Sequence, residues 1–326
     1  MSTLLGWMEV TLLVAIVGAL TGALVGSLFL ALSKHRIESF APHRRVWMLR
    51  VVAWAPLIGA GLALTVAYFP SLIDLAGIAS DHCGDHAGHP LHLCFLHYPP
   101  PALLPPVTWF TLGMALIVSH HWWDALRAVR RTHRWANDLA KLSSYDEETG
   151  AYVVETDTCF AVTVGLFHRR ILFSEGLRRV LSPAQLQAVL SHEQAHRHRF
   201  DSLHRLFTQI AMVFYLPSTR RFVLEQIALA SEQCCDEAAA TTVEDRITVA
   251  EAILTVARAS RGAEVPAGVL RFGDTRIEQR IQALLDGNWQ RPGLWGLGAL
   301  LAIFILTLFH FHTLHHGLEH AVAWLT

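Results

Sequence analysis

The sequence predicts a mainly α-helical, polytopic membrane protein that carries an α+β domain with a small antiparallel sheet. Three observations lead to this fold class. The 326 residues are 52% hydrophobic and only 16% charged, with a mean hydropathy of +0.35, which is too apolar for an ordinary soluble protein. The apolar residues are gathered in long uncharged blocks. The charged residues fall mainly in one stretch, 124–291, which has the hydropathy pattern of a soluble domain.

Four blocks are expected to cross a lipid bilayer. Residues 10–32 and 51–69 are uncharged and long enough to span it as helices, whereas 107–123 and 294–309 are shorter and flanked by aromatic residues. The first block is longer than the core of a signal peptide and no basic segment precedes it, so a permanent anchor is expected.

Glycines mark one face of the first block. Gly18, Gly22 and Gly26 recur every four residues, a stripe that lets another helix approach closely. This predicts tight packing within the membrane and allows a homodimer. Small residues are also common in membrane helices that have no such role.

The positions of lysine and arginine predict the orientation. All of them lie in 34–50 or in 127–291, and short loops rich in these residues stay on the cytoplasmic side. With four spans, this rule places both termini and the loop 70–105 outside. We therefore expect a membrane domain at 1–123, a cytoplasmic domain at 124–291, and a last span with a short outer tail at 292–326. The basic residues are dispersed and no recognition motif accompanies them, so no direct contact with nucleic acid is expected.

The segments expected outside are rich in cysteine and histidine. Cys83 and Cys94 lie in loop 70–105, where an oxidising environment would allow them to form a disulfide. The histidines of the loop and the tail are His82, His86, His89, His92, His97, His310, His312, His315, His316 and His320. Such clusters could bind transition metals or sense acidity, although biased composition in a solvated segment is the simpler explanation.

The segment 192–196 (HEQAH) has the spacing of a catalytic zinc site. Residues 182–185 (SPAQ) predict a helix start, with serine as N-cap, proline at the first helical position and glutamine completing a capping box. On this helix His192 and His196 share one face and can bind the same zinc ion, while Glu193 lies beside them as a general base for the attacking water. Two unrelated histidines on a solvated helix are the alternative.

A catalytic zinc site needs a third protein ligand, and a second predicted helix, 222–238, can supply it. Glu232 is the candidate ligand, and Asp236, one turn later, can orient one of the two histidines. Asp201 could support the site from the end of the motif helix. The adjacent cysteines at 234–235 are expected to be small buried residues, because neighbours on a helix cannot both face one metal ion. A solvated acidic face is the alternative for the two carboxylates.

Three β-rich runs, 152–155, 160–164 and 171–173, precede the motif helix and predict the antiparallel sheet. One of them could align an extended substrate by backbone hydrogen bonds, and the sequence does not say which. A basic helical stem is expected at 124–142. The stretch 207–216 is apolar but too short to span, so it is expected to pack behind the motif helix or lie in the membrane interface.

Several segments resemble the membrane metallopeptidases of the BlaR/MecR type. They are 165–167 (GLF), 170–177 (RILFSEGL), 181–182 (LS), 190–196 (LSHEQAH), Asp201, Glu232, 235–237 (CDE), and Arg280 and Ile281 with Leu284 and Leu285. The resemblance covers residues 105–290 and the flanking spans. It implies a gluzincin-like fold in which His192, His196 and Glu232 bind Zn²⁺ and Glu193 is the catalytic base.

The resemblance also implies a location and a role. Proteins of this type lie in the bacterial inner membrane, where an outside stimulus activates the inner protease to cleave itself or a cytoplasmic transcriptional repressor. This sequence departs from the best-known members, which carry a penicillin-binding sensor after the last span. Here a short histidine-rich tail without a Ser-x-x-Lys motif follows that span. Antibiotic sensing by acylation is therefore not expected for this chain alone.

Two other functions are considered. A quality-control protease resembling HtpX or the prenyl-protein proteases would use the same chemistry, but those families place the HExxH segment differently among their spans. A non-catalytic receptor could use zinc only to hold two helices together. A structural site, however, has no use for a base such as Glu193 and normally closes its fourth position. The sequence therefore predicts a zinc-dependent metalloendopeptidase that acts in transmembrane signalling.

Overall fold

The computed structural model describes residues 2–78, 103–259, 270–271, 276–286 and 311–325. Two long helices, α1 (Ser2–Glu38) and α2 (Pro42–Leu75), form a hairpin in which each is long and apolar enough to cross a membrane, over Gly6–Lys34 and Pro42–Ile73. These two helices contain the first two predicted spans.

The third and fourth predicted spans are not among the candidate membrane helices of the described residues. Helix α3 (Pro105–Lys141) runs without a break from the third predicted span into the predicted stem, and it does not reach the hydropathy of α1 and α2. The fourth predicted span, the outer-loop histidines, and Cys83 and Cys94 lie outside the described residues. The structure thus shows two candidate membrane helices, and the four-span arrangement remains a prediction.

The glycine stripe of α1 packs against α2. A Cβ atom at Gly18 would lie 2.5 Å from the backbone oxygen of Gly59, and one at Gly22 would lie 2.1 Å from that of Ala55. Gly26 faces the ring of Tyr215, which comes from a different part of the chain. The close approach predicted from the glycine spacing therefore occurs within the chain, and a homodimer is not needed to explain it.

A five-stranded sheet has the order β1-β2-β4-β3-β5, from β1 (Ser143–Asp146), β2 (Ala151–Val154), β3 (Ala161–Val164), β4 (Arg170–Ser174) and β5 (Leu270–Arg271). The three predicted runs match β2, β3 and β4. The prediction of an antiparallel sheet is wrong in one respect, because β2 and β4 pair in parallel and the sheet is mixed. The reason is that β3 and β4 form a hairpin whose second strand inserts next to β2.

Helices cover both faces of this sheet. Ala136 of α3 packs against Val162 and Leu172 on one face. On the other face, Phe173 packs in a core with Val189 of α5 (Pro183–Arg199). The same core includes residues of α4 (Glu175–Val180), α7 (Pro217–Val243), α8 (Arg246–Ala259) and α9 (Ile277–Asp286). The sheet therefore lies directly against the helix that carries the histidine motif.

The hairpin of α1 and α2 shares a further core with the helices that follow the motif. After α6 (Asp201–Ala211), a short 3-10 helix, η2 (Met212–Phe214), leads to Tyr215, which is buried and donates a hydrogen bond to the backbone oxygen of Val52 on α2. Leu49 of α2 and Ile227 of α7 belong to the same core. The stretch 207–216 is thus the end of α6 and a turn that packs against the hairpin of α1 and α2.

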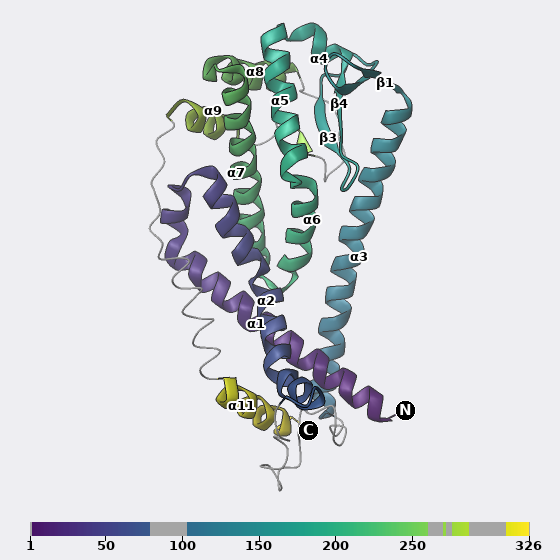
Figure 1. Cartoon of the computed structure of the whole chain (residues 1–326), viewed down its shortest axis with the longest axis vertical. Coiled ribbons are helices and arrows are strands. Elements are labelled where there is room, and N and C mark those ends of the chain that lie inside the picture. Colours follow the sequence, from purple (N-terminus) through teal and green to yellow (C-terminus); the bar gives the residue numbers. More distant parts are fainter. Residues whose placement is uncertain (1, 79–102, 260–269, 272–275, 287–310, 326) are drawn as a thin grey trace.

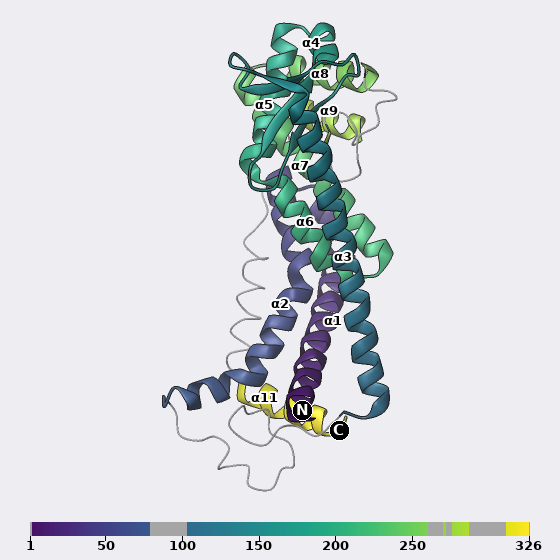
Figure 2. The same cartoon turned by 90° about the vertical axis from the view of Figure 1, so that its right-hand side faces the viewer.

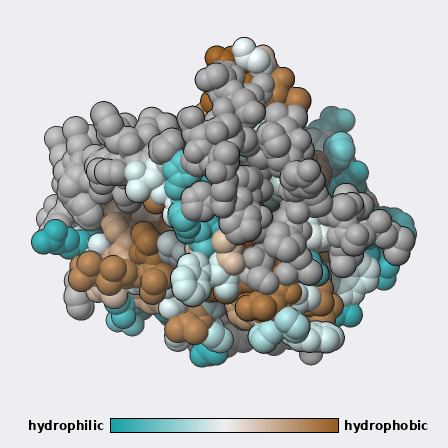
Figure 3. Space-filling view, turned by 90° about the horizontal axis from the view of Figure 1, so that it is seen from below, coloured by the Kyte–Doolittle hydropathy of each residue, from teal (hydrophilic) through white to brown (hydrophobic). Residues whose placement is uncertain are grey.

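At the opposite end of the molecule lies α11 (Phe311–Ala323), which Figures 1 and 2 show beside the ends of α1 and α2. The ring of His315 is buried, and its Nδ1 atom is 2.8 Å from the backbone oxygen of Val66 on α2. Seen from this end, the described residues form hydrophobic patches among hydrophilic ones (Figure 3). The described part of the histidine-rich tail is therefore a helix packed on α2.

Candidate metal centre

Two neighbouring helices carry the predicted ligands. Helix α5 begins as expected: the Ser182 hydroxyl accepts a hydrogen bond from the backbone of Gln185, whose side chain accepts one from the backbone of Ser182. The helix ends at Phe200, which adopts the left-handed conformation with φ 55° and starts α6 at once. This sharp turn brings Asp201 back toward His196.

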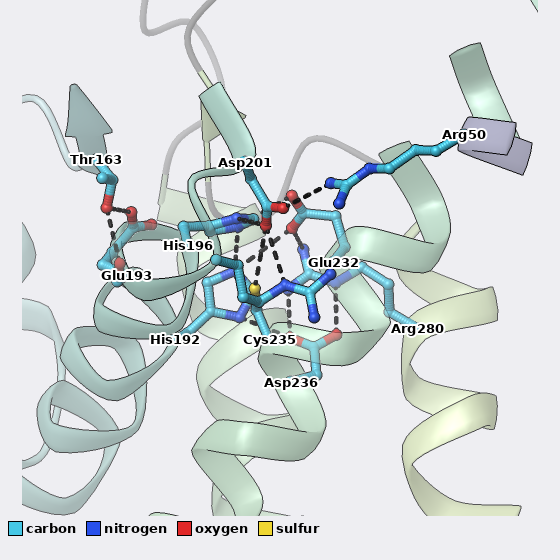
Figure 4. Close-up of polar contacts among 11 residues, drawn as sticks. Arg50, Thr163, His192, Glu193, His196, Asp201, Glu232, Cys235, Asp236 and Arg280 are labelled. Carbon is cyan, nitrogen blue, oxygen red and sulfur yellow. Dashed lines mark hydrogen bonds and ion pairs between the residues drawn. The ribbon is translucent and has the colours of Figure 1, made fainter. Parts of the chain in front are cut away.

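The three predicted ligands converge, although they come from positions 192, 196 and 232 of the chain. The Nε2 atoms of His192 and His196 are 3.1 Å apart. Glu232 places its two carboxylate oxygens 3.5 Å from Nε2 of His192 and 3.4 Å from Nε2 of His196. All three side chains are buried. Figure 4 shows them pointing toward one another from two helices.

These distances fit a metal ion. In a tetrahedral zinc site with bonds of about 2.0–2.1 Å, the ligand atoms are about 3.3 Å from one another. Two imidazole nitrogens and a carboxylate oxygen are also a common donor set of catalytic zinc sites. The donors of His192, His196 and Glu232 therefore match such an ion in spacing and in chemistry.

Each histidine is oriented by a carboxylate. Nδ1 of His192 is 2.9 Å from Asp236, and Nδ1 of His196 is 2.9 Å from Asp201. At His196, donation of the Nδ1 proton to Asp201 leaves Nε2 with a lone pair for a metal ion and fixes the angle of the ring. His192 makes an ion-pair contact with Asp236 at a similar distance, in which Nδ1 does not meet the geometry of a hydrogen bond. The structure thus brings Asp236 and Asp201 to the positions in which they can support the site, one for each histidine.

A buried arginine balances the carboxylates of α7. Arg280 of α9 is fully buried; its Nε and Nη2 atoms contact the two oxygens of Asp236 at 2.8 and 2.6 Å, and its Nη1 atom is 3.0 Å from Glu232. Burial opposes the charged form of both carboxyl groups, but Arg280 and the histidines hold the pKa of Asp236 below its ordinary value and that of Glu232 well below it. The sequence marked Arg280 only as part of a family resemblance and did not predict this contact.

Glu193 lies on the side of α5 that faces the sheet. Its carboxylate is buried, and the hydroxyl of Thr163 on β3 donates to its Oε2 atom at 2.7 Å and to its backbone oxygen at 2.9 Å. The second oxygen, Oε1, has no hydrogen-bond partner among the described residues. One oxygen is thus held in place while the other can accept a proton. Thr163 was not predicted from the sequence.

Cys235 is buried next to the site. Its Sγ atom is 3.9 Å from Oδ2 of Asp201. Burial raises the pKa of its thiol to about 12. Burial lowers the pKa of His196, but contacts with Cys235, Asp201 and Glu232 outweigh this effect and raise it well above 6.5. A metal ion at the site must therefore compete with a proton on His196.

A cleft of about 370 Å³ lies between α3, the β3–β4 turn and α6. Thr163, which contacts Glu193, is part of its wall. Arg130 of α3, Phe167 of the turn and Arg205 of α6 also line it. The cleft thus borders β3 at Thr163, the residue that contacts Glu193.

The fold and the site together define a class: a mainly helical protein with two candidate membrane helices and a candidate metal centre of the kind that hydrolases use. The family described as BlaR1 peptidase M56 matches residues 105–284, and the chain belongs to this family. The resemblance found in the sequence is therefore confirmed, and with it the assignment to the peptidases. No curated protein matches the chain.

Proposed function

We propose that this chain is a zinc-dependent membrane endopeptidase that acts in transmembrane signalling, by cleaving itself, a cytoplasmic transcriptional repressor, or both. The observation that carries the proposal is the convergence of His192, His196 and Glu232. Glu193 follows His192 directly on α5, and its Oε1 atom is buried and has no partner among the described residues. A site that only held two helices together would not need this carboxylate.

The residues divide the chemistry between them. His192, His196 and Glu232 would hold Zn²⁺, which supplies Lewis-acid activation of the scissile carbonyl and of the attacking water. Glu193 accepts a proton from that water through its Oε1 atom and later delivers it to the leaving amine. Thr163 keeps the carboxylate of Glu193 in place during both transfers.

Self-cleavage is supported by the pairing of β5 with β3. Strand β5 runs antiparallel to β3, with Leu270 opposite Thr163 and Arg271 opposite Val162. Thr163 is the residue that contacts Glu193. An extended segment added to a sheet edge in this way is bound as a peptide substrate would be. We infer that the segment between α8 and α9 is a substrate of the site.

The proposed setting follows from the charge distribution. The metal centre lies near the ends of α1 and α2 that meet at residues 39–41, close to the first cluster of basic residues, 34–50. By the positive-inside rule this is the cytoplasmic end, in a bacterial inner membrane with both termini outside. A repressor in the cytoplasm would then reach the cleft directly.

The decisive variant is Glu193→Gln in the full-length chain, purified in detergent and loaded with zinc. Glutamine has the same shape and can still accept from Thr163, so we expect one bound zinc per chain and no cleavage. The wild-type chain is expected to give two fragments with a cut between residues 259 and 277, detected by mass spectrometry. Glu251→Gln, the same change at an exposed position on α8, is the control and should cleave normally.

Two outcomes would overturn the proposal. Cleavage by purified Glu193→Gln at the wild-type rate would remove Glu193 as the base, and a wild-type chain without stoichiometric metal would remove the zinc site. A zinc-loaded wild-type chain that is cut only outside residues 259–277 would contradict the inference from β5 alone.

A further inference from the structure

A membrane helix takes part in the metal centre. Arg50 lies near the start of α2, and its Nη2 atom is 3.0 Å from Oδ1 of Asp201. Both side chains are largely buried, with 21% of Arg50 and 2% of Asp201 exposed. Figure 4 shows Arg50 reaching Asp201 from outside the helices that carry the ligands.

Asp201 connects this arginine to a predicted ligand. Its Oδ1 atom contacts Arg50, while its Oδ2 atom accepts the hydrogen bond from Nδ1 of His196 at 2.9 Å. Arg199 also approaches Oδ2, at 3.3 Å. Because the two oxygens belong to one planar group, Arg50 fixes the plane of the carboxylate that orients the His196 ring.

A second arginine of α2 reaches the other ligand helix. Arg45 is buried and donates to the side chain of Gln233, the residue next to Glu232. Gln233 in turn donates to the backbone oxygen of Gln279, at 3.0 Å, next to Arg280. Helix α2 thus contacts the surroundings of both His196 and Glu232.

The same helix extends to the opposite end of the molecule. Val66, which His315 of α11 contacts, lies sixteen residues beyond Arg50, a distance of about 24 Å along a helix with a rise of 1.5 Å per residue. Between these points α2 packs on α1 through the glycine stripe. Helix α2 is one helix over this range, with Pro56 inside it, so the same element joins the contact with α11 to Arg50.

Resting on the proposed function, we propose that Arg50 is a positioning residue through which α2 controls the metal centre: by holding Asp201 it sets the orientation of His196, so a shift of α2 changes metal binding and cleavage together. The competing explanation is an ion pair that only docks α2 on the catalytic helices. The two differ in whether the metal itself responds to the loss of Arg50.

The experiment uses the full-length chain in detergent and measures the metal directly. Zinc affinity is determined by competition with a chelator, and cobalt(II) is bound in place of zinc because its visible absorption reports the ligand geometry. For Arg50→Gln we expect a loss of zinc affinity of about tenfold, at the lower end of the 10–100-fold range for groups that orient metal-bound histidines, and an altered cobalt spectrum. Arg50→Lys, which keeps the charge, should recover part of both.

Two further variants separate positioning from docking. Tyr215→Phe removes a hydrogen bond between α2 and the catalytic helices that has no contact with a ligand, and it should leave zinc affinity and the cobalt spectrum unchanged. In Asp201→Asn the link is already broken, so adding Arg50→Gln should cause little further loss. Such non-additivity is expected only if Arg50 acts through Asp201.

The inference is overturned if Arg50→Gln binds zinc and cobalt as the wild type does, or if Tyr215→Phe changes both as strongly. It is also overturned if the losses in Arg50→Gln and Asp201→Asn add fully. Each of these results can occur in a protein that binds zinc and cleaves through Glu193, so the proposed function would stand.

Discussion

Replacing Arg280 by methionine is expected to destabilise the metal-free protein strongly. The change removes a fully buried guanidinium that makes two contacts to Asp236 and one to Glu232, and it leaves two buried carboxylates without this cation. Removing one partner of a buried ion pair costs about 3–5 kcal/mol. For a domain of this size, that corresponds to a fall in the unfolding temperature of about 6–20 °C.

The pH dependence gives a second readout. In the wild type the pKa of Asp236 is held below 3.8, so the stability from this pair is present above that pH and is lost as the pH falls through the lowered pKa. Without Arg280 the buried carboxyl group has its pKa raised instead. The difference in unfolding free energy between variant and wild type should therefore be largest at neutral pH and shrink toward pH 4.

Thermal and denaturant unfolding of the metal-free chain, followed by circular dichroism between pH 4 and 8, would test this. Arg280→Lys is the matched variant: it keeps the charge but cannot contact both oxygens of Asp236 in the same plane, so an intermediate loss is expected. Saturating zinc should restore part of the stability of Arg280→Met, because the ion neutralises Glu232. Equal stability of Arg280→Met and wild type at pH 7 would refute the reasoning.

Three more outcomes are expected. Thr163→Val should slow cleavage about tenfold or more while leaving zinc affinity unchanged, because the carboxylate of Glu193 loses its hydrogen bond; a parallel fall in zinc affinity would assign Thr163 a different role. Zinc affinity should fall by about tenfold per pH unit below the raised pKa of His196, measured by chelator competition, and a flat profile would contradict the competition with a proton. Gly22→Leu should disrupt the hairpin and lower the unfolding temperature, whereas Gly61→Leu, where a Cβ atom meets nothing within 4 Å, should not.

Local spacing explains what the sequence could predict. The start of α5 follows from residues 182–185, and the shared face of His192 and His196 follows from a four-residue offset on one helix. The strands β2, β3 and β4 follow from their β-branched runs. The pairing of β2 with β4 does not, because the position of a hairpin in a sheet is decided by packing between distant segments.

The two arginines show where prediction from sequence ends. Each histidine of the site has a carboxylate on its Nδ1 atom, and a buried carboxylate needs a cation or several hydrogen bonds. The need for positive charge near Asp236 and Asp201 could thus be inferred once the metal centre was predicted. Which of the 26 lysines and arginines supply it could not, because Arg280 is 44 residues from Asp236 and Arg50 is 151 residues from Asp201.

Both cations come from elements outside the pair of helices that holds the ligands. Arg280 belongs to α9, which follows the segment proposed for cleavage, and Arg50 belongs to a candidate membrane helix. Under the proposed function, the two arginines would link the ligands to the helix that follows the cleaved segment and to the helix that controls the centre. If the arginines act in this way, changes in α2 and α9 would reach the ligands through Asp201, Asp236 and Glu232.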